Sequence, residues 1–415
     1  MRIDHLHLQH FKGFAEQDFR FHPEFNLLVG TNGTGKTTVL DALSIAVGSW
    51  FLGVRGMDTR HIRASEVMLR RFDESGEQPG HWEPQFPCEI AASGQVQGKP
   101  LQWQRALNFK DGRTTQMRAR TVKAMASAAQ QAVMNGETIA LPLIAYYGTG
   151  RLWQEPRERY QVNDPSHLAS KEKTSRLMGY ENSVDPRLSV ANLTRWFARQ
   201  SWIAYQKQEE SGVFLIVKQA ITRCIPDAHL IDFDASLGEI IVHTQRGSQP
   251  FSNLSDGQRC MLAMVGDLAQ KAWTLNPHLG QAVLSQVEGV VLIDELDLHL
   301  HPTWQQHVIE DLRTTFPKLQ FICTTHSPFL IQSLRSGDEL LMLEGQSLHD
   351  LGNRSIESIA RDIQQVSHTE TGLRYAQMKD TAAGYLSELD DIAALEGVVR
   401  ADAFSVTCCI VQAKH

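Results

Sequence analysis

The sequence predicts an α/β fold that is built around a parallel β-sheet. The apolar run FNLLVG (25–30) ends in glycine and leads through TNGTGKTT into a helix pattern, which is the order of a buried strand, a turn and a helix. GVVLIDE (289–295) and LQFICTTH (319–326) are two further buried-strand patterns, and the helix pattern TWQQHVIEDLRTTF (303–316) lies between them. Strand, helix and strand in this order predict neighbouring parallel strands.

The other elements follow from the same periodicities. IDHLHLQHF (3–11) alternates as a strand does, and CEIAAS (88–93) and LQWQRALNF (101–109) predict a hairpin around a glycine-containing turn. Further along the chain we expect a strand at 141–148, a polar loop from about 150 to 190, helical structure at 191–224, a hairpin at 231–244, a helix at 253–270 and a charged helical tail at 353–395.

Together these elements predict a main α/β part with a mixed sheet, called the head below, a helical insertion and a helical C-terminal tail. The predicted divisions are a first part of the head at 1–150, a loop and helical insertion with a hairpin at 151–250, a second part of the head at 251–350, and a tail at 351–415.

The composition is that of a large globular protein. The chain has 415 residues, of which 42% are hydrophobic, and a net charge of −7, so it is not a polycation that binds nucleic acid by charge alone. The six cysteines show no C-x-x-C spacing, which predicts reduced thiols, a cytoplasmic protein and no zinc site. The longest apolar stretch (42–54) is shorter than the about 20 residues that span a bilayer, so we expect no membrane association.

The strongest motif is the glycine-rich loop that follows the strand at 25–30. It matches G-x-x-x-x-G-K-[ST], in which backbone N–H groups and the positive end of a helix surround phosphate oxygens. Lys36 is predicted to supply charge for the outer phosphates of a nucleotide, and Thr37 a hydroxyl for Mg²⁺. The other predicted nucleotide-binding residues of the loop are Gly30, Asn32, Gly33, Thr34, Gly35 and Thr38. The alternative is a glycine-rich turn that binds no ligand.

Polar residues also end the two later strands of the predicted sheet. Asp294 is expected to support Mg²⁺, and Glu295 to polarise an attacking water. His326 follows the next strand at the carboxyl edge, where ligands bind in such sheets, and is a candidate γ-phosphate sensor. Alone, an apolar strand that ends in two acids is common, and a lone histidine is more often structural.

The segment NLSDGQ (253–258) opens the helix at 253–270 with two polar residues, an acid and a glycine. A simple cap explains part of this pattern, because Ser255 can accept a backbone hydrogen bond and Asp256 suits the positive end of the helix.

The glycine loop, LSDGQ, the acidic strand end and His326, in this order, resemble the ATP-binding-cassette (ABC-type) ATPases. In that family the LSGGQ helix of one subunit closes over nucleotide held by the glycine loop of another. The resemblance implies a head-to-tail homodimer that binds two Mg·ATP, with Glu295 and His326 as catalytic residues. It also implies that Ser255 and Gly257 contact the γ-phosphate in trans, with Gln258 nearby. Asp256 departs from the pattern, because a glycine stands there in the family.

Three other segments indicate the branch of this family. HFKGF (10–14) is similar to the start of SMC- and RecF-like ATPases, in which the basic residue, here Lys12, lies near the nucleotide. DELDLHLHP (294–302) resembles the overcoming-lysogenization (OLD-like) ATPases. Together with LPLIAYYGTGRLW (141–153), these segments resemble the AAA-labelled ATPase subunit of Septu-type and retron-associated antiphage systems, which implies an HNH-type nuclease as partner.

There are two alternatives to the defence function, of which the first stays open and the second is disfavoured. A RecF-like DNA-repair ATPase would bind DNA in an ATP-dependent way without a nuclease partner. A transporter motor is disfavoured, because neither a membrane segment nor a clear Q-loop is present, and the candidate glutamines are Gln95, Gln102, Gln104 and Gln116.

Two basic runs, 55–71 and 105–123, are candidate DNA contacts in an otherwise acidic protein. The first contains Arg55, Arg60, Arg63, Arg70 and Arg71, and the second Arg105, Lys110, Arg113, Arg118, Arg120 and Lys123. The alternative is a solvated surface without a ligand.

Overall fold

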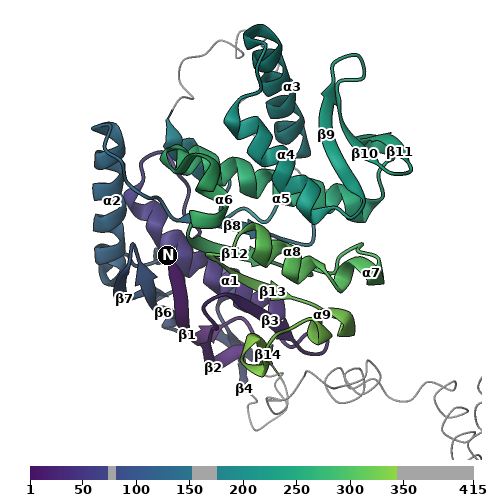
Figure 1. The fold of residues 1–415 in the computed structure, drawn as a ribbon. Helices are drawn as coiled ribbons and strands as arrows, with labels where there is room; N and C mark the ends of the chain where they lie inside the picture. Colours follow the sequence, from purple (N-terminus) through teal and green to yellow (C-terminus); the bar gives the residue numbers. More distant parts are fainter. Residues whose placement is uncertain (73–80, 152–174, 344–415) are drawn as a thin grey trace, which may run out of the picture. The chain divides into compact units, whose positions relative to one another are not determined.

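The structure is a computed structural model that describes residues 1–72, 81–151 and 175–343 (Figure 1). At its centre is a five-stranded sheet in the order β14-β3-β13-β12-β8, and every neighbouring pair is parallel. Its strands are β3 (Phe25–Val29), β8 (Leu143–Tyr147), β12 (Gly289–Ile293), β13 (Leu319–Thr324) and β14 (Leu340–Met342). All residues of the four strands other than β14 are buried, as their mainly apolar runs predict for a sheet covered on both faces.

An antiparallel sheet in the order β2-β1-β6-β7 lies against the same core. Its strands are β1 (Arg2–Phe11), β2 (Phe14–Arg20), β6 (Cys88–Val96) and β7 (Lys99–Leu107). Helix α1 (Lys36–Val47) packs between the two sheets, against β12 and β13 and against β1, β6 and β7. This position explains why α1 is apolar on nearly every side, with a buried run from Ala42 to Val47.

The part between β8 and β12 is mainly helical. Helices α3 (Val190–Lys207), α4 (Gly212–Cys224) and α5 (Asp256–Leu275) pack on one another, and α5 packs on β8. The antiparallel strands β9 (Ala228–Asp234), β10 (Glu239–Thr244) and β11 (Gly247–Pro250) form a small sheet beside α3 and α4 (Figure 1). Short helix α6 (Val283–Gln286) then leads into β12.

The α/β class is confirmed, and so are the hairpins predicted at 88–109 and at 231–244. The helix predicted at 303–316 is divided into α7 (Pro302–Gln305) and α8 (Val308–Thr315), and α9 (Pro328–Gln332) follows β13. The parallel and antiparallel strands of the predicted mixed sheet lie in separate sheets.

Several elements carried too weak a pattern to be predicted. They are β2, the exposed hairpin β4 (Leu69–Phe72) and β5 (His81–Pro84), helix α2 (Arg120–Met134), β11 and β14. The predicted tail at 351–415 lies outside the described residues, as does most of the predicted loop at 150–190. The described residues belong to one compact unit, in which strands from both predicted parts of the head share the parallel sheet.

Among the described cysteines, Cys88, Cys224, Cys260 and Cys323 are free and buried. Cys408 and Cys409 lie outside the described residues. None of the helices in the described ranges combines the length and the hydrophobicity that crossing a lipid bilayer requires.

Candidate nucleotide-binding and catalytic site

The glycine loop joins the carboxyl end of β3 to the first turn of α1. Gly33 and Gly35 have φ of 88° and 99°, a left-handed conformation that glycine adopts without steric cost. Gly35 is the N-cap of α1, and a Cβ added there would lie 2.7 Å from the ring of Phe14. Glycine at 33 and 35 therefore suits the turn, and glycine at 35 also leaves room for Phe14 of β2, which packs closely against the loop.

Lys36 lies inside this loop. Its side chain is buried, and Nζ donates hydrogen bonds to the carbonyl oxygens of Gly30 at 2.7 Å and Thr31 at 2.9 Å. The amine therefore sits in the concavity that the loop forms. The loop, the amine and the N-terminus of α1 together make a cradle whose donors fit a polyphosphate.

Thr37 and Asp294 meet although they are 257 positions apart. Thr37 Oγ1 lies 2.9 Å and 3.2 Å from the two carboxylate oxygens of Asp294, which is almost completely buried at the end of β12. Thr324 Oγ1, at the end of β13, donates a further hydrogen bond of 2.7 Å to Asp294. A hydroxyl and a carboxylate fixed side by side are hard oxygen ligands, so the residues present fit Mg²⁺ beside a polyphosphate.

Glu295 follows Asp294 in a strained backbone conformation. Its φ is 50°, which is unusual for a residue other than glycine, and its N–H donates to Thr324 Oγ1 at 2.7 Å. No described residue donates a hydrogen bond to the Glu295 carboxylate. This carboxylate therefore differs from that of Asp294, which accepts hydrogen bonds from Thr37 and Thr324.

His326 is exposed and lies two positions beyond β13, which pairs with both β3 and β12. The sheet order thus places it between the strand of the glycine loop and the strand of Asp294, at the same carboxyl edge. Ser327 after it caps α9 and accepts hydrogen bonds from the N–H groups of Phe329 and Leu330.

The LSDGQ segment forms a complete capping box at the start of α5. Ser255 Oγ accepts from the N–H of Gln258 at 3.3 Å, and Gln258 Oε1 accepts from the N–H of Ser255 at 3.0 Å. Asp256 forms an ion pair of 2.5 Å with Arg259, one turn further along the helix. The acid that departs from the family pattern is therefore neutralised within its own helix.

Gly257 has a structural reason of its own. It is buried, and a Cβ added there would lie 2.4 Å from the carbonyl oxygen of His299. The start of α5 thus packs directly on the loop that follows Glu295. Whether Ser255 and Gly257 contact phosphate in trans stays a prediction.

Lys12 belongs to a partly buried charge cluster beside α1. Its Nζ pairs with Asp41 and lies 3.7 Å from Glu66, and Arg60 pairs with Asp41 at 2.5 Å and with Glu66 at 2.7 Å. Burial alone would raise the pKa of the Asp41 carboxyl, but hydrogen bonds and charge from Arg60 and Lys12 lower it below its usual value.

We expect Asp41→Asn to lower the free energy of unfolding by about 2 kcal/mol at neutral pH, because it removes one of the two carboxylates that the partly buried Arg60 and Lys12 share and leaves them with Glu66 alone. Since the pKa of Asp41 is lower in the folded chain, its stabilisation is complete above the unfolded-state pKa and is lost as the pH falls through the folded-state pKa. Urea unfolding at neutral and at acid pH measures both effects, with exposed Asp111→Asn as control. A stability difference that does not shrink in acid would contradict this account.

The two basic runs are not continuous cationic surfaces. Arg105 is fully buried, and burial lowers its pKa to about 10. Arg60 is committed to Asp41 and Glu66 in the charge cluster. Arg105 and Arg60 are therefore not candidate DNA contacts, while Arg55, Arg63, Arg70 and Arg71 are exposed.

Two residues at this edge were missed by sequence reasoning. Thr324 bridges Asp294 and Glu295, and Arg151 donates to the carbonyl oxygens of both. Neither belongs to a short motif whose chemistry is readable from spacing. Of the Q-loop candidates, Gln95, Gln102 and Gln104 lie on β6 and β7, which belong to the antiparallel sheet and not to the parallel one.

The chain is similar to several known proteins. The chain is 24% identical to the retron Ec83 probable ATPase of Escherichia coli over 83% of its own length and 72% of that protein. It is 25% identical to the Septu protein PtuA of Bacillus mycoides, over 83% of this chain but 41% of that protein. The solved SMC head bound to the C-winged helix domain of ScpA aligns with 84% of this chain and 96% of that chain, at 16% identity and a TM-score of 0.47.

The resemblance to ATPases of the retron and Septu type, first drawn from the motifs, is thereby confirmed. Two AAA-domain family models match the chain. One, whose description names the AbiEii toxin of a Type IV TA system, matches residues 150–332. The other, described as an AAA domain, matches residues 5–225, more than half of the chain, and this protein therefore belongs to the AAA-domain family, with the ABC-type order of ATPase motifs.

Proposed function

We propose that this chain binds Mg·ATP in the glycine loop, hydrolyses it slowly and uses the nucleotide state to regulate a partner nuclease in antiphage defence. The observation that carries the ATPase part is the contact between Thr37 and Asp294 at 2.9 Å. It joins the loop that would bind phosphate to the strand end that would support the metal. A structural glycine turn has no need of this contact.

Each residue at the carboxyl edge has a separate role in this proposal. Lys36 holds the outer phosphates, and Thr37 and Asp294 hold Mg²⁺, which when bound neutralises charge on the phosphates. Glu295 orients and polarises the attacking water, because its carboxylate is not engaged by a described donor. His326 contacts the γ-phosphate from the end of β13.

The active form in this proposal is a head-to-tail homodimer. Ser255 is exposed at the N-terminus of α5, a 20-residue helix, and the positive end of such a helix suits an anion. The pairing of Asp256 with Arg259 removes the repulsion that an unpaired acid would exert on a phosphate. Ser255 and the backbone at Gly257, with Gln258 nearby, then close the site of the other subunit.

The output passes through a second protein in this proposal. The names of the retron and Septu relatives support a place in antiphage defence, and the resemblance to the Septu ATPase subunit implies an HNH-type nuclease as the partner. The segment at 351–415 is proposed to dock that partner, and the exposed arginines of 55–71 remain candidates for a direct DNA contact. A protein of this kind acts in the cytoplasm.

The mass of the protein in solution, measured with and without Mg·ATP, tests this function. We expect ATP to convert the chain to a dimer, and co-expression with a neighbouring HNH reading frame to give a complex whose nuclease activity changes with the nucleotide. Deleting 351–415 is expected to abolish the complex, and unchanged binding would exclude the docking role. An ATP-dependent dimer that binds DNA and recruits no nuclease would instead favour the RecF-like repair function.

A further inference from the structure

Arg151 lies buried at a junction of three segments of the head. Only 1% of it is exposed, and it follows β8 by four positions. Nη1 donates to the carbonyl oxygens of Gly148 at 3.0 Å and Asp294 at 2.7 Å, and Nη2 donates to that of Glu295 at 2.8 Å. Nε lies 2.8 Å from Sγ of Cys260 on α5. One guanidinium therefore joins the ends of β8 and β12 to the helix that begins with LSDGQ.

These bonds act on the strained part of the site. Glu295 has a φ of 50°, and such a conformation persists only where its surroundings impose it. Thr324 holds its N–H and Arg151 its carbonyl oxygen, so the peptide groups on both sides of the Glu295 Cα are tied to buried partners. The direction of the Glu295 side chain depends on this backbone, since φ and ψ determine where Cβ points.

The same junction reaches the LSDGQ helix by two further contacts. Tyr147 Oη, at the end of β8, donates to Asp267 of α5 at 2.6 Å. Gly257 packs so closely on His299 that a Cβ there would lie 2.4 Å from its carbonyl oxygen. A displacement of α5 should therefore also displace the loop that carries Glu295, because close-packed backbone segments do not move independently.

We propose that Arg151 is a positioning residue that holds the Asp294–Glu295 backbone in its reactive conformation and links it to α5. As far as the hydrolysis rate is concerned, this inference rests on the proposed ATPase function. A lysine cannot replace the arginine, because an ammonium has neither the planar fork nor the number of donors that reach three carbonyl oxygens and a sulfur.

Arg151→Lys is the first test, and Arg176→Lys is its matched control. Arg176 also donates to backbone carbonyl oxygens, those of Leu275 and Ile139, but at the opposite end of α5. We expect Arg151→Lys to lower kcat for ATP hydrolysis by about 100-fold, the size of effect that a misplaced catalytic group produces, with ATP affinity within about 3-fold of the native chain. Arg176→Lys is expected to leave kcat unchanged. Equal kcat values for both variants would overturn the proposal.

Hydrogen exchange separates this inference from the proposed function. The N–H groups of Leu296, Leu298 and Leu300 are bonded within the loop or to Thr324, and we expect Arg151→Lys to speed their exchange while residues 30–37 exchange as in the native chain. If the native chain does not hydrolyse ATP, the ATPase proposal fails, yet faster exchange at 295–301 still supports the positioning role. Unchanged exchange there would reject it.

Cys260 variants keep the test open if Arg151→Lys does not fold. Cys260→Ala removes the acceptor on α5 and leaves the carbonyl contacts in place, whereas Cys260→Ser retains an acceptor. We expect faster exchange at 295–301 in Cys260→Ala and near-native exchange in Cys260→Ser, with buried Cys88→Ala as control. The same exchange rate in Cys260→Ala and the native chain would show that α5 is not linked to Glu295 through Arg151.

Discussion

Glu295→Gln is expected to bind Mg·ATP as tightly as the native chain and to hydrolyse it about 1,000-fold more slowly, because a glutamine cannot accept a proton from water. The amide has nearly the shape of the carboxylate, and the backbone bonds to Thr324 and Arg151 do not involve the side chain. The nucleotide should therefore stay bound, and the ATP-bound dimer should accumulate.

Two measurements check this result. Single-turnover hydrolysis gives the rate of the chemical step, and light scattering after ATP addition gives the dimer fraction over time. Glu209→Gln, an exposed acid between α3 and α4, controls for the loss of one negative charge. Hydrolysis by Glu295→Gln at the native rate would remove Glu295 from the proposed mechanism.

Lys36→Ala is expected to weaken ATP binding by roughly 100-fold, which corresponds to the loss of a charge-assisted hydrogen bond to phosphate. Nζ already lies in the loop on the carbonyl oxygens of Gly30 and Thr31, so no rearrangement of the fold is needed to bring it to the phosphates. Dimerisation on ATP addition should be lost with the nucleotide.

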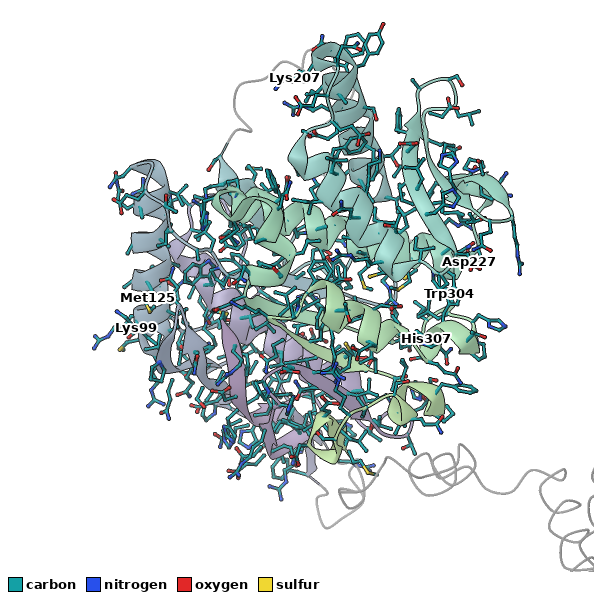
Figure 2. The ribbon with its side chains drawn as sticks, viewed as in Figure 1. Lys99, Met125, Lys207, Asp227, Trp304 and His307 are labelled. Carbon is teal, nitrogen blue, oxygen red and sulfur yellow. The ribbon has the colours of Figure 1, made fainter. Side chains whose placement is uncertain are left out.

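Calorimetric titration with Mg·ATP measures this affinity. Lys207→Ala is the matched control, because Lys207 ends α3 on the exposed part of the helical region (Figure 2). We expect that control to bind as the native chain does. An unchanged affinity in Lys36→Ala would mean that the glycine loop is not the nucleotide site, and would leave only its role as a turn.

The sequence predicted the elements whose pattern is local. The runs of β3, β12 and β13 are mainly apolar, with Asn26, Gln320 and Thr324 as polar members, and they appear in the structure as fully buried parallel strands. Helix α2 was missed although it is amphipathic; its buried residues are Val122, Ala126 and Ala129, and two of these three are small alanines. The fully exposed strand β4 gave no alternation of buried and exposed positions at all.

Charge patterns in the sequence were less informative than motifs. Arg105 and Lys110 look equivalent along the chain, yet Arg105, on β7, is fully buried and donates to the carbonyl oxygen of Thr115, while Lys110 is exposed. Residues 103–107 of β7 are all buried, so both sides of this part of the strand are covered, and the sequence around a single arginine does not reveal such covering. The ion pair between Asp256 and Arg259, by contrast, is an i, i+3 contact within one helix.

The sequence by itself determined the glycine loop, the two acids after β12 and the cap of α5, because each is set by residues adjacent in the chain. Only the tertiary structure decided that Thr37 meets Asp294 across 257 positions and that Arg151 reaches Asp294 across 143. Such contacts depend on the order of strands in the parallel sheet and on the packing of α5 against β8. No local periodicity records either of them, because a hydrogen bond between distant segments leaves no pattern in the spacing of neighbouring residues.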